Sequence, residues 1–92
     1  MIDWSEPALM DVERIVLFLV QEDMVLASDM AQMIFDAGAR LAQMPDRGRP
    51  GRVRNTRELL VQKTPYLIVY SRGKVVNILR VLHSRQKWPC EG

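Results

Sequence analysis

The spacing of apolar residues changes from a helical to a strand period about halfway along this 92-residue chain, near Pro45. Before Pro45, apolar residues recur at every third or fourth position, which places them on one side of a helix. After it, short segments rich in β-branched and aromatic residues alternate with turn sequences, as in antiparallel strands. A chain with its helices first and its strands afterwards favours an α+β fold, with helices on one face of an antiparallel sheet.

Two helices joined by a short turn are predicted in the first half, forming an antiparallel hairpin. The first spans about Glu6 to Glu22. Ser5 precedes it and can cap the free N–H groups of its first turn. Its apolar stripe begins at Leu9, and the charged residues nearby are predicted to lie off that stripe: Asp11, Glu13 and Arg14.

The second helix is predicted to span about Leu26 to Met44, and Pro45 ends it. Gly38 lies inside this helix, where glycine is unfavourable by about 1 kcal/mol relative to alanine. The position therefore predicts close packing of the helix against a neighbouring element.

Three strands are predicted in the second half, at Thr56–Val61, Tyr66–Ser71 and Val75–Leu82. Residues 45–55 contain two glycines and two prolines and are predicted to form a loop. A tight turn around Gly73 joins the last two strands, and a short opening strand at residues 2–4 can join the edge of the sheet. We therefore predict one domain, residues 1–92, with the helix hairpin on a sheet of three to four strands.

Alternation divides the later strands into two faces. In the middle strand, Tyr66, Ile68 and Tyr70 share one side. In the last strand, alternation groups Val75, Leu79 and Val81 against Val76, Ile78, Arg80 and Leu82. Both sides are apolar, so these strands are expected to be central, and the pattern leaves open which side faces the helices.

Charge is distributed unevenly, although the net charge is only +2. Residues 1–45 carry two basic and eight acidic side chains, a net charge of −6, whereas residues 46–92 carry eleven basic and three acidic ones, a net charge of +8. We predict that the cations of the second half form one surface for phosphates or for an acidic protein. The alternative is that the arginine-rich segment is only solvated.

Several classes of protein are excluded by the sequence. The longest apolar run, Ile15–Val20, is far shorter than the ~20 residues that span a bilayer. The first four residues lack the basic start and apolar core of a secretory signal, so a cytoplasmic protein is expected. Cys90 has no cysteine partner, and with a single histidine it cannot build a metal site, so no metal or cofactor is expected.

His83 is the only side chain whose ordinary pKa lies near neutral pH. It ends the last predicted strand, close to Arg85, where it could serve as a general acid in phosphate chemistry. The alternative is a strand-end histidine that caps backbone groups or packs against Trp88. Ser84 lacks the partners of a hydrolytic triad other than His83 itself.

A series of short motifs, each weak alone, follows the helix hairpin and completes a pattern from Trp4 to Pro89. The motifs are Gly48-Arg49-Pro50-Gly51-Arg52-Val53, Thr56-Arg57-Glu58-Leu59, Pro65-Tyr66-Leu67-Ile68-Val69-Tyr70, Ile78-Leu79-Arg80-Val81-Leu82-His83 and Trp88-Pro89. In order and spacing, the series resembles the RelE/ParE superfamily of toxins from bacterial type II toxin–antitoxin modules. The resemblance implies a compact α+β toxin that a cognate antitoxin wraps and neutralises in a hetero-oligomer, often near the hairpin and the sheet edge.

Members of this superfamily have two activities. RelE-like toxins cleave messenger RNA in the ribosomal A site with basic residues, whereas ParE-like toxins are associated with poisoning of DNA gyrase. Nuclease members typically carry an arginine where this chain has Leu67, and often lysines where it has Glu58 and Leu59–Val61. Loss of those cations removes charge stabilisation from the reacting phosphate, so the chain resembles the ParE-like toxins more closely.

Three hypotheses follow from the resemblance. The first is a ParE-like toxin that acts on gyrase and is not an enzyme. Its target-binding residues would be Arg49, Arg52, Arg54, Arg57, Arg80, Arg85 and Trp88. The second is a ribosome-dependent mRNA endonuclease, with His83 as proton donor and Arg85 among the arginines that hold the phosphate. The third is an inactive homologue retained to bind the antitoxin.

Overall fold

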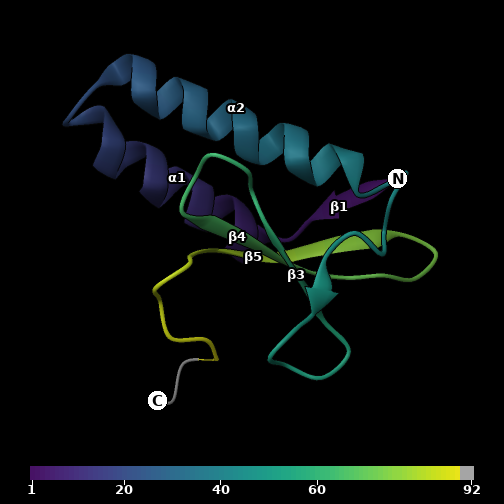
Figure 1. Ribbon diagram of the computed structural model, residues 1–92. Helices are drawn as coiled ribbons and strands as arrows, with labels where there is room; N and C mark the ends of the chain where they lie inside the picture. Colours follow the sequence, from purple (N-terminus) through teal and green to yellow (C-terminus); the bar gives the residue numbers. More distant parts are fainter. Residues whose placement is uncertain (90–92) are drawn as a thin grey trace.

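The computed structural model describes residues 1–89, so Cys90 lies outside the described residues. Two helices cover one face of a five-stranded sheet (Figure 1). The elements in chain order are β1 (Ile2–Trp4), α1 (Glu6–Val20), α2 (Met24–Arg40), β2 (Arg49–Pro50), β3 (Arg57–Leu60), β4 (Tyr66–Ser71) and β5 (Val76–His83). The predicted α+β class, with a helix hairpin on one face of the sheet, is confirmed.

The sheet differs from the prediction at its two edges. Its strand order is β1-β5-β4-β3-β2, and the three central strands form the predicted antiparallel meander. β1 joins the edge next to β5 but runs parallel to it, with Ile2 opposite Val76, so the sheet is mixed. At the other edge, Arg49 and Pro50 form a two-residue strand inside the segment predicted as a loop.

The start of α1 agrees with the predicted cap. The Ser5 hydroxyl accepts a hydrogen bond from the Ala8 N–H at 3.2 Å and donates one to the Leu79 carbonyl at 2.9 Å. Ser5 therefore caps the helix and also fixes its first turn to β5. The helix ends at Val20, two residues before the predicted end.

The second helix begins and ends earlier than predicted. Asp23 caps it, because its carboxylate accepts from the N–H groups of Val25 and Leu26, at 2.8 and 3.2 Å. The helix ends at Arg40, and turns follow at residues 41–43. These turns keep Leu41 fully buried while the chain leaves toward β2.

The path from these turns to β2 is fixed by the hydroxyl of Tyr70 on β4. This hydroxyl donates to the Pro45 carbonyl at 2.7 Å and accepts from the Gly48 N–H at 2.9 Å. A Cβ atom on Gly48 would lie 2.7 Å from the same hydroxyl, so only glycine leaves room for this contact.

Close packing at Gly38 is confirmed. A Cβ atom added there would lie 2.9 Å from Cη2 of the Trp4 indole. Trp4 also packs against Phe35 of α2, with ring centroids 4.9 Å apart. Because glycine has no side chain, α2 can pack at Gly38 directly against the Trp4 indole of β1.

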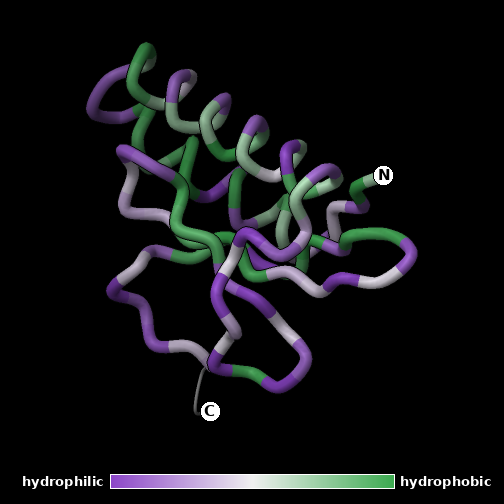
Figure 2. Tube along the Cα trace, turned by 45° about the vertical axis from the view of Figure 1, so that its right-hand side comes forward, coloured by the Kyte–Doolittle hydropathy of each residue, from purple (hydrophilic) through white to green (hydrophobic). Residues whose placement is uncertain are grey.

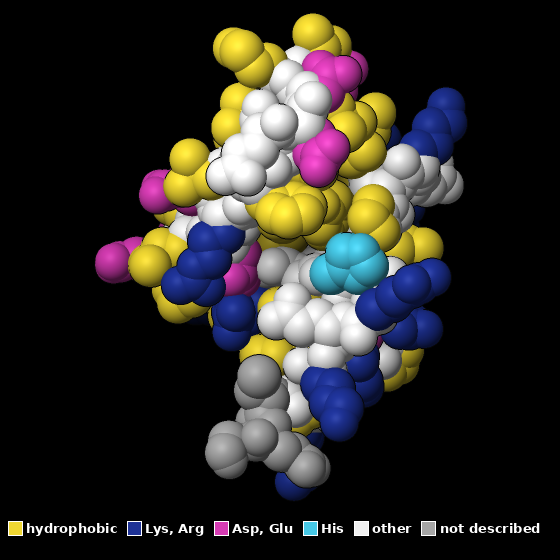
Figure 3. Space-filling view, turned by 90° about the vertical axis from the view of Figure 1, so that its left-hand side faces the viewer, with side chains coloured by type: hydrophobic (Ala, Val, Ile, Leu, Met, Phe, Trp, Pro, Cys, Tyr) yellow, Lys and Arg dark blue, Asp and Glu magenta, His cyan; other side chains and the backbone are white. Residues whose placement is uncertain are grey.

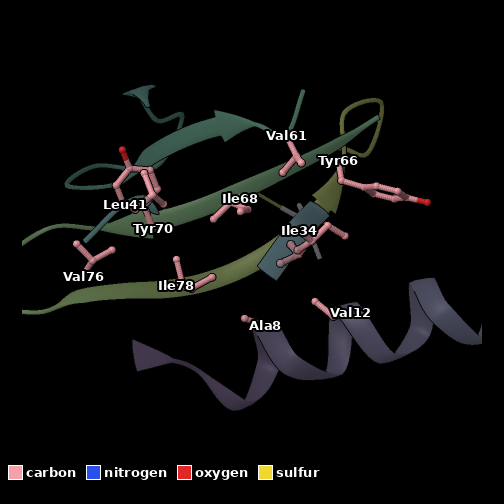
Figure 4. Packing of buried hydrophobic residues seen from close by; sticks show 11 residues of the cluster. Ala8, Val12, Ile34, Leu41, Val61, Tyr66, Ile68, Tyr70, Val76 and Ile78 are labelled. Atoms are coloured by element: carbon pink, nitrogen blue, oxygen red, sulfur yellow. The ribbon is translucent and has the colours of Figure 1, made fainter. Parts of the chain in front are cut away.

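The main core lies between the helices and the sheet (Figure 4). Its buried members are Ala8, Val12, Ile34, Leu41, Val61, Tyr66, Ile68, Tyr70, Val76, Ile78 and Val81. The three alternate residues of β4 predicted to share one side are therefore those that face the helices.

A β-bulge interrupts the alternation of β5, and the alternation predicted for this strand was wrong across it. Val69 is opposite Arg80, but the next residue of β4 is opposite Ile78, which leaves Leu79 as an extra residue. Because a bulge shifts the side chains beyond it by one position, Val81 shares the core side with Ile78 and not with Leu79.

Candidate target-binding surface

The face of the sheet opposite the helices is covered by irregular segments. The segment at 51–56 and the chain after β5 lie on this side of the sheet, and both are rich in hydrophilic residues (Figures 1 and 2). Leu67, Val69 and Leu82 are buried although they are not part of the core beneath the helices. The segment at 51–56 and the residues after β5 therefore lie on the same side of the sheet, whereas Arg57 is opposite the core residue Tyr70 and Arg80 binds Asp11 of α1.

Glu58 is the buried anchor of the arginine-rich segment. Its side chain is 1% exposed, and its carboxylate accepts from the Arg52 N–H at 2.9 Å. The guanidinium groups of Arg52 and Arg49 also donate to it, at 3.2 and 3.3 Å. The resemblance to the RelE/ParE superfamily singled out Glu58 only because nuclease members often carry a lysine there. In the structure, the Glu58 carboxylate holds β2 and the following residues against β3.

The environment of Glu58 acts on its pKa in two directions. Burial raises the pKa of this carboxyl, but the hydrogen bonds from the Arg52 N–H and from the Arg52 and Arg49 side chains outweigh burial and hold it below its ordinary value of 4.5. Glu58 is therefore ionised at neutral pH, and it neutralises part of the charge of Arg49 and Arg52.

Arg57 is held by the backbone of the segment that follows α2. Its guanidinium donates to the Gly48 carbonyl at 2.6 Å and to the Asp46 carbonyl at 3.3 Å. The Asp46 carboxylate is 4.0 Å away. Arg57 therefore satisfies carbonyl groups at the sheet end, and only a quarter of its side chain is exposed.

Arg80 is held by α1. Its guanidinium donates to both carboxylate oxygens of Asp11, at 2.7 and 3.0 Å, and Asp11 also accepts from the Val81 N–H at 3.0 Å. The other side of the guanidinium packs on the Trp88 ring, 5.5 Å from its centroid. The prediction that Asp11 lies off the buried stripe was wrong. Its buried carboxylate accepts from the Val81 N–H, which lies in the part of β5 that does not pair with β1.

Arg54 and Arg85 differ from the other predicted arginines. Both are exposed, and within residues 1–89 neither guanidinium has a hydrogen bond or an ion pair. Trp88 is only partly exposed, because it packs on Arg80. The predicted patch therefore consists of four arginines with partners inside the protein and two whose donors face solvent.

His83 lies on the surface at the end of β5, between apolar side chains and Lys or Arg side chains (Figure 3). It is opposite Tyr66, with ring centroids 5.8 Å apart and the rings nearly perpendicular. Its Nδ1 accepts from the Arg85 N–H at 3.1 Å. This geometry agrees with the backbone-capping interpretation, and the ring packs on Tyr66 where the sequence had suggested Trp88.

The described part of the chain has neither a metal-binding cluster nor a membrane-spanning helix. Residues 1–89 contain no cluster of three or more His, Cys, Asp or Glu side chains that could hold a metal ion. None of the helices there has the length and hydropathy needed to cross a bilayer.

Comparison with known proteins first defines the class of protein. The fold matches a solved structure described as "Chromosomal ParDE TA system from P. aeruginosa", with a TM-score of 0.80 and 26% identity, over 89% of this chain and 92% of that one. The class is therefore that of small α+β toxins from toxin–antitoxin modules, which confirms the RelE/ParE resemblance.

The sequence comparisons identify the family within this class. Residues 2–88 match the family model described as "ParE toxin of type II toxin-antitoxin system, parDE", and the chain belongs to this ParE toxin family. A relative from Sinorhizobium fredii (strain NBRC 101917 / NGR234), described as "Putative toxin Y4kP", is 38% identical over 88 residues, which cover 96% of this chain and 92% of the relative.

Proposed function

We propose that this protein is a growth-inhibiting toxin that acts on DNA gyrase in the cytoplasm and that a cognate antitoxin neutralises it by forming a complex with it. Membership of the ParE family supports this function, as does the identity of the residues at the nuclease positions. Leu67 is buried where nuclease members carry an arginine, and Glu58 is an anion bound to two arginines. Neither side chain can stabilise the developing charge of a cleaved phosphate.

Arg54 and Arg85 are proposed as the main contacts to the target. The observation that supports this choice is the absence of an internal partner for either guanidinium within residues 1–89. Arg80 binds the buried Asp11 carboxylate, and Arg57 donates to the Gly48 and Asp46 carbonyls. Each must lose these contacts before it binds elsewhere, which makes both poor candidates. Arg49 is intermediate, because it binds Glu58 while 68% of its side chain remains exposed.

A double charge reversal tests this assignment. The Arg54→Glu/Arg85→Glu variant should inhibit supercoiling by purified gyrase about tenfold less than the unaltered protein, because like charges then face an acidic surface or DNA phosphates. Lys74→Glu changes one exposed cation in the turn between β4 and β5 and is the matched control. Equal inhibition by the double variant and the control would refute the role of these arginines, and no inhibition by the unaltered protein would refute gyrase as the target.

Replacement of His83 tests the nuclease alternative. His83→Ala is expected to leave growth inhibition unchanged, because the ring only caps the Arg85 N–H and packs on Tyr66 at the surface. Growth after induced expression is the measurement, with the melting temperature as a check on folding. A folded variant that no longer inhibits growth would favour the ribosome-dependent endonuclease.

A further inference from the structure

A pocket lies at one end of the sheet, where β2 and β4 end and β3 begins. It is lined by Pro50, Asn55, Thr56, Arg57 and Arg72. The strand register brings these residues together, because Arg57 is opposite Pro50 of β2 and opposite Tyr70 of β4. His83 is opposite Tyr66, so the exposed Arg85 that follows it belongs to the other end of β4. The pocket is therefore separate from the target contact proposed at Arg85.

Two guanidinium groups meet beside this pocket. Arg72 donates to Oδ1 of Asp46, and the same oxygen lies 4.0 Å from Nη2 of Arg57. Among the described residues, no other carboxylate pairs with either guanidinium. Two cations thus converge on one anionic oxygen and carry one positive charge more than their partner neutralises. Such a pair attracts a further negative charge.

Arg57 has donors to spare at this pocket. Its Nη1 donates to the carbonyls of Gly48 and Asp46, at 2.6 and 3.3 Å, and this fixes the guanidinium. Its Nε and Nη2 groups form no hydrogen bond within residues 1–89, and neither does the side-chain amide of Asn55. A small anion inside the pocket can bind these donors without breaking the carbonyl contacts. Because Arg57 is already held in place, little conformational freedom is lost on binding.

A phosphate group fits these donors better than a carboxylate does. It carries more than one negative charge near neutral pH and presents more acceptor oxygens, and guanidinium groups bind it through two parallel hydrogen bonds. The pocket volume of about 420 Å³ leaves room for a phosphate group and the atoms bonded to it. Asp46 is a weak competitor, because its side chain is 66% exposed and can turn into solvent at little cost.

We propose that this pocket binds a phosphate group, which bridges Arg57 and Arg72 in place of the Asp46 carboxylate and accepts from the Asn55 amide. Two sources offer this chemistry, namely a small molecule with a terminal phosphate and the backbone of a nucleic acid. The site does not depend on gyrase as the target, and Arg72 is not among the arginines predicted to bind the target.

Titration with inorganic phosphate tests the pocket directly. At constant ionic strength, the NMR signals of the Arg72 Nε–H and the Asn55 amide should shift to saturation as phosphate replaces chloride. Arg72→Gln should weaken phosphate binding at least fivefold, because it removes charge-assisted hydrogen bonds. Lys74→Gln removes an exposed cation from the same turn and should change it less than twofold. The absence of a saturable shift, or equal weakening by the two variants, would overturn the proposal.

Removal of the competing carboxylate should have the opposite effect. Asp46→Asn is expected to bind inorganic phosphate at least threefold more tightly than the unaltered protein, because no anion then competes for the two guanidinium groups. Asp29→Asn, at an exposed position of α2, changes the net charge equally and should leave the affinity unchanged. Equal strengthening by both variants would show that net charge alone decides binding, and the pocket would be refuted.

A comparison of probes identifies the source of the phosphate. Binding of a short DNA duplex with 5′-hydroxyl ends is measured at the same fixed salt concentration. If Arg72→Gln weakens duplex binding more than Lys74→Gln does, the pocket takes a backbone phosphate. If it weakens only the binding of inorganic phosphate, the pocket takes a terminal phosphate. Melting temperatures of the free variants separate weaker binding from loss of folding.

Discussion

Replacing Asp11 with alanine is expected to lower the free energy of unfolding by about 3 kcal/mol, because breaking a buried ion pair leaves its partner groups unsatisfied. Asp11 is 7% exposed and binds both the Arg80 guanidinium and the Val81 N–H. The Arg80 side chain is 30% exposed and can partly return to water, which places the effect at the lower end of the usual range.

Urea unfolding of Asp11→Ala near neutral pH measures this effect. Asp29→Ala, at an exposed position of α2, is the matched control and should change stability by less than about 0.5 kcal/mol. In the Asp11→Ala background, Arg80→Met should cost far less than it does alone, because the two residues stabilise the fold through one network. Additive effects of the two substitutions would contradict the proposed coupling.

Glu58→Gln is expected to destabilise the fold by about 2 kcal/mol near pH 7, because hydrogen bonds to a charged group are replaced by weaker ones. The effect should depend on pH in a defined direction. The pKa of Glu58 is below 4.5 in the folded protein, so the ionised carboxylate stabilises the fold above that pH. This contribution is lost as the pH falls through the folded-state pKa.

The stability difference between the unaltered protein and Glu58→Gln should therefore be full near pH 7 and should shrink on acidification below about pH 4.5. Urea unfolding at several pH values measures it, and Glu13→Gln on the exposed side of α1 is the control. A difference that grows on acidification would show that burial, and not the arginine contacts, dominates the pKa of Glu58.

The features predicted correctly from the sequence depend on local chemistry. The Ser5 cap, the two apolar helix stripes and the alternation of β4 each involve neighbouring residues and a fixed period. Gly38 was informative because glycine inside a helix is unfavourable unless a neighbour needs the space.

The features that were missed depend on contacts between distant residues. A three-residue β1 carries no pattern that distinguishes parallel from antiparallel pairing, and β2 has only two exposed residues, one of them proline. The bulge at Leu79 was hidden because apolar residues occupy both sides of β5.

The cationic surface shows the same limit. Composition and position predicted that the arginines share one face, but they did not predict the partners that hold four of these arginines. Asp11 is 69 positions from Arg80 in the sequence, and only the fold brings the two together. An acid three residues after the buried Ala8, on the same side of α1, was the available signal for Asp11.

The pairing of β1 with β5 has a consequence for synthesis of this protein on the ribosome. Ile2 is opposite Val76, and β5 also pairs with β4 and contacts α1. A nascent chain that ends before residue 76 therefore lacks the central strand on which its first helix packs, and it exposes the apolar stripe of that helix. The complete fold can therefore form only after nearly the whole described chain has left the ribosome.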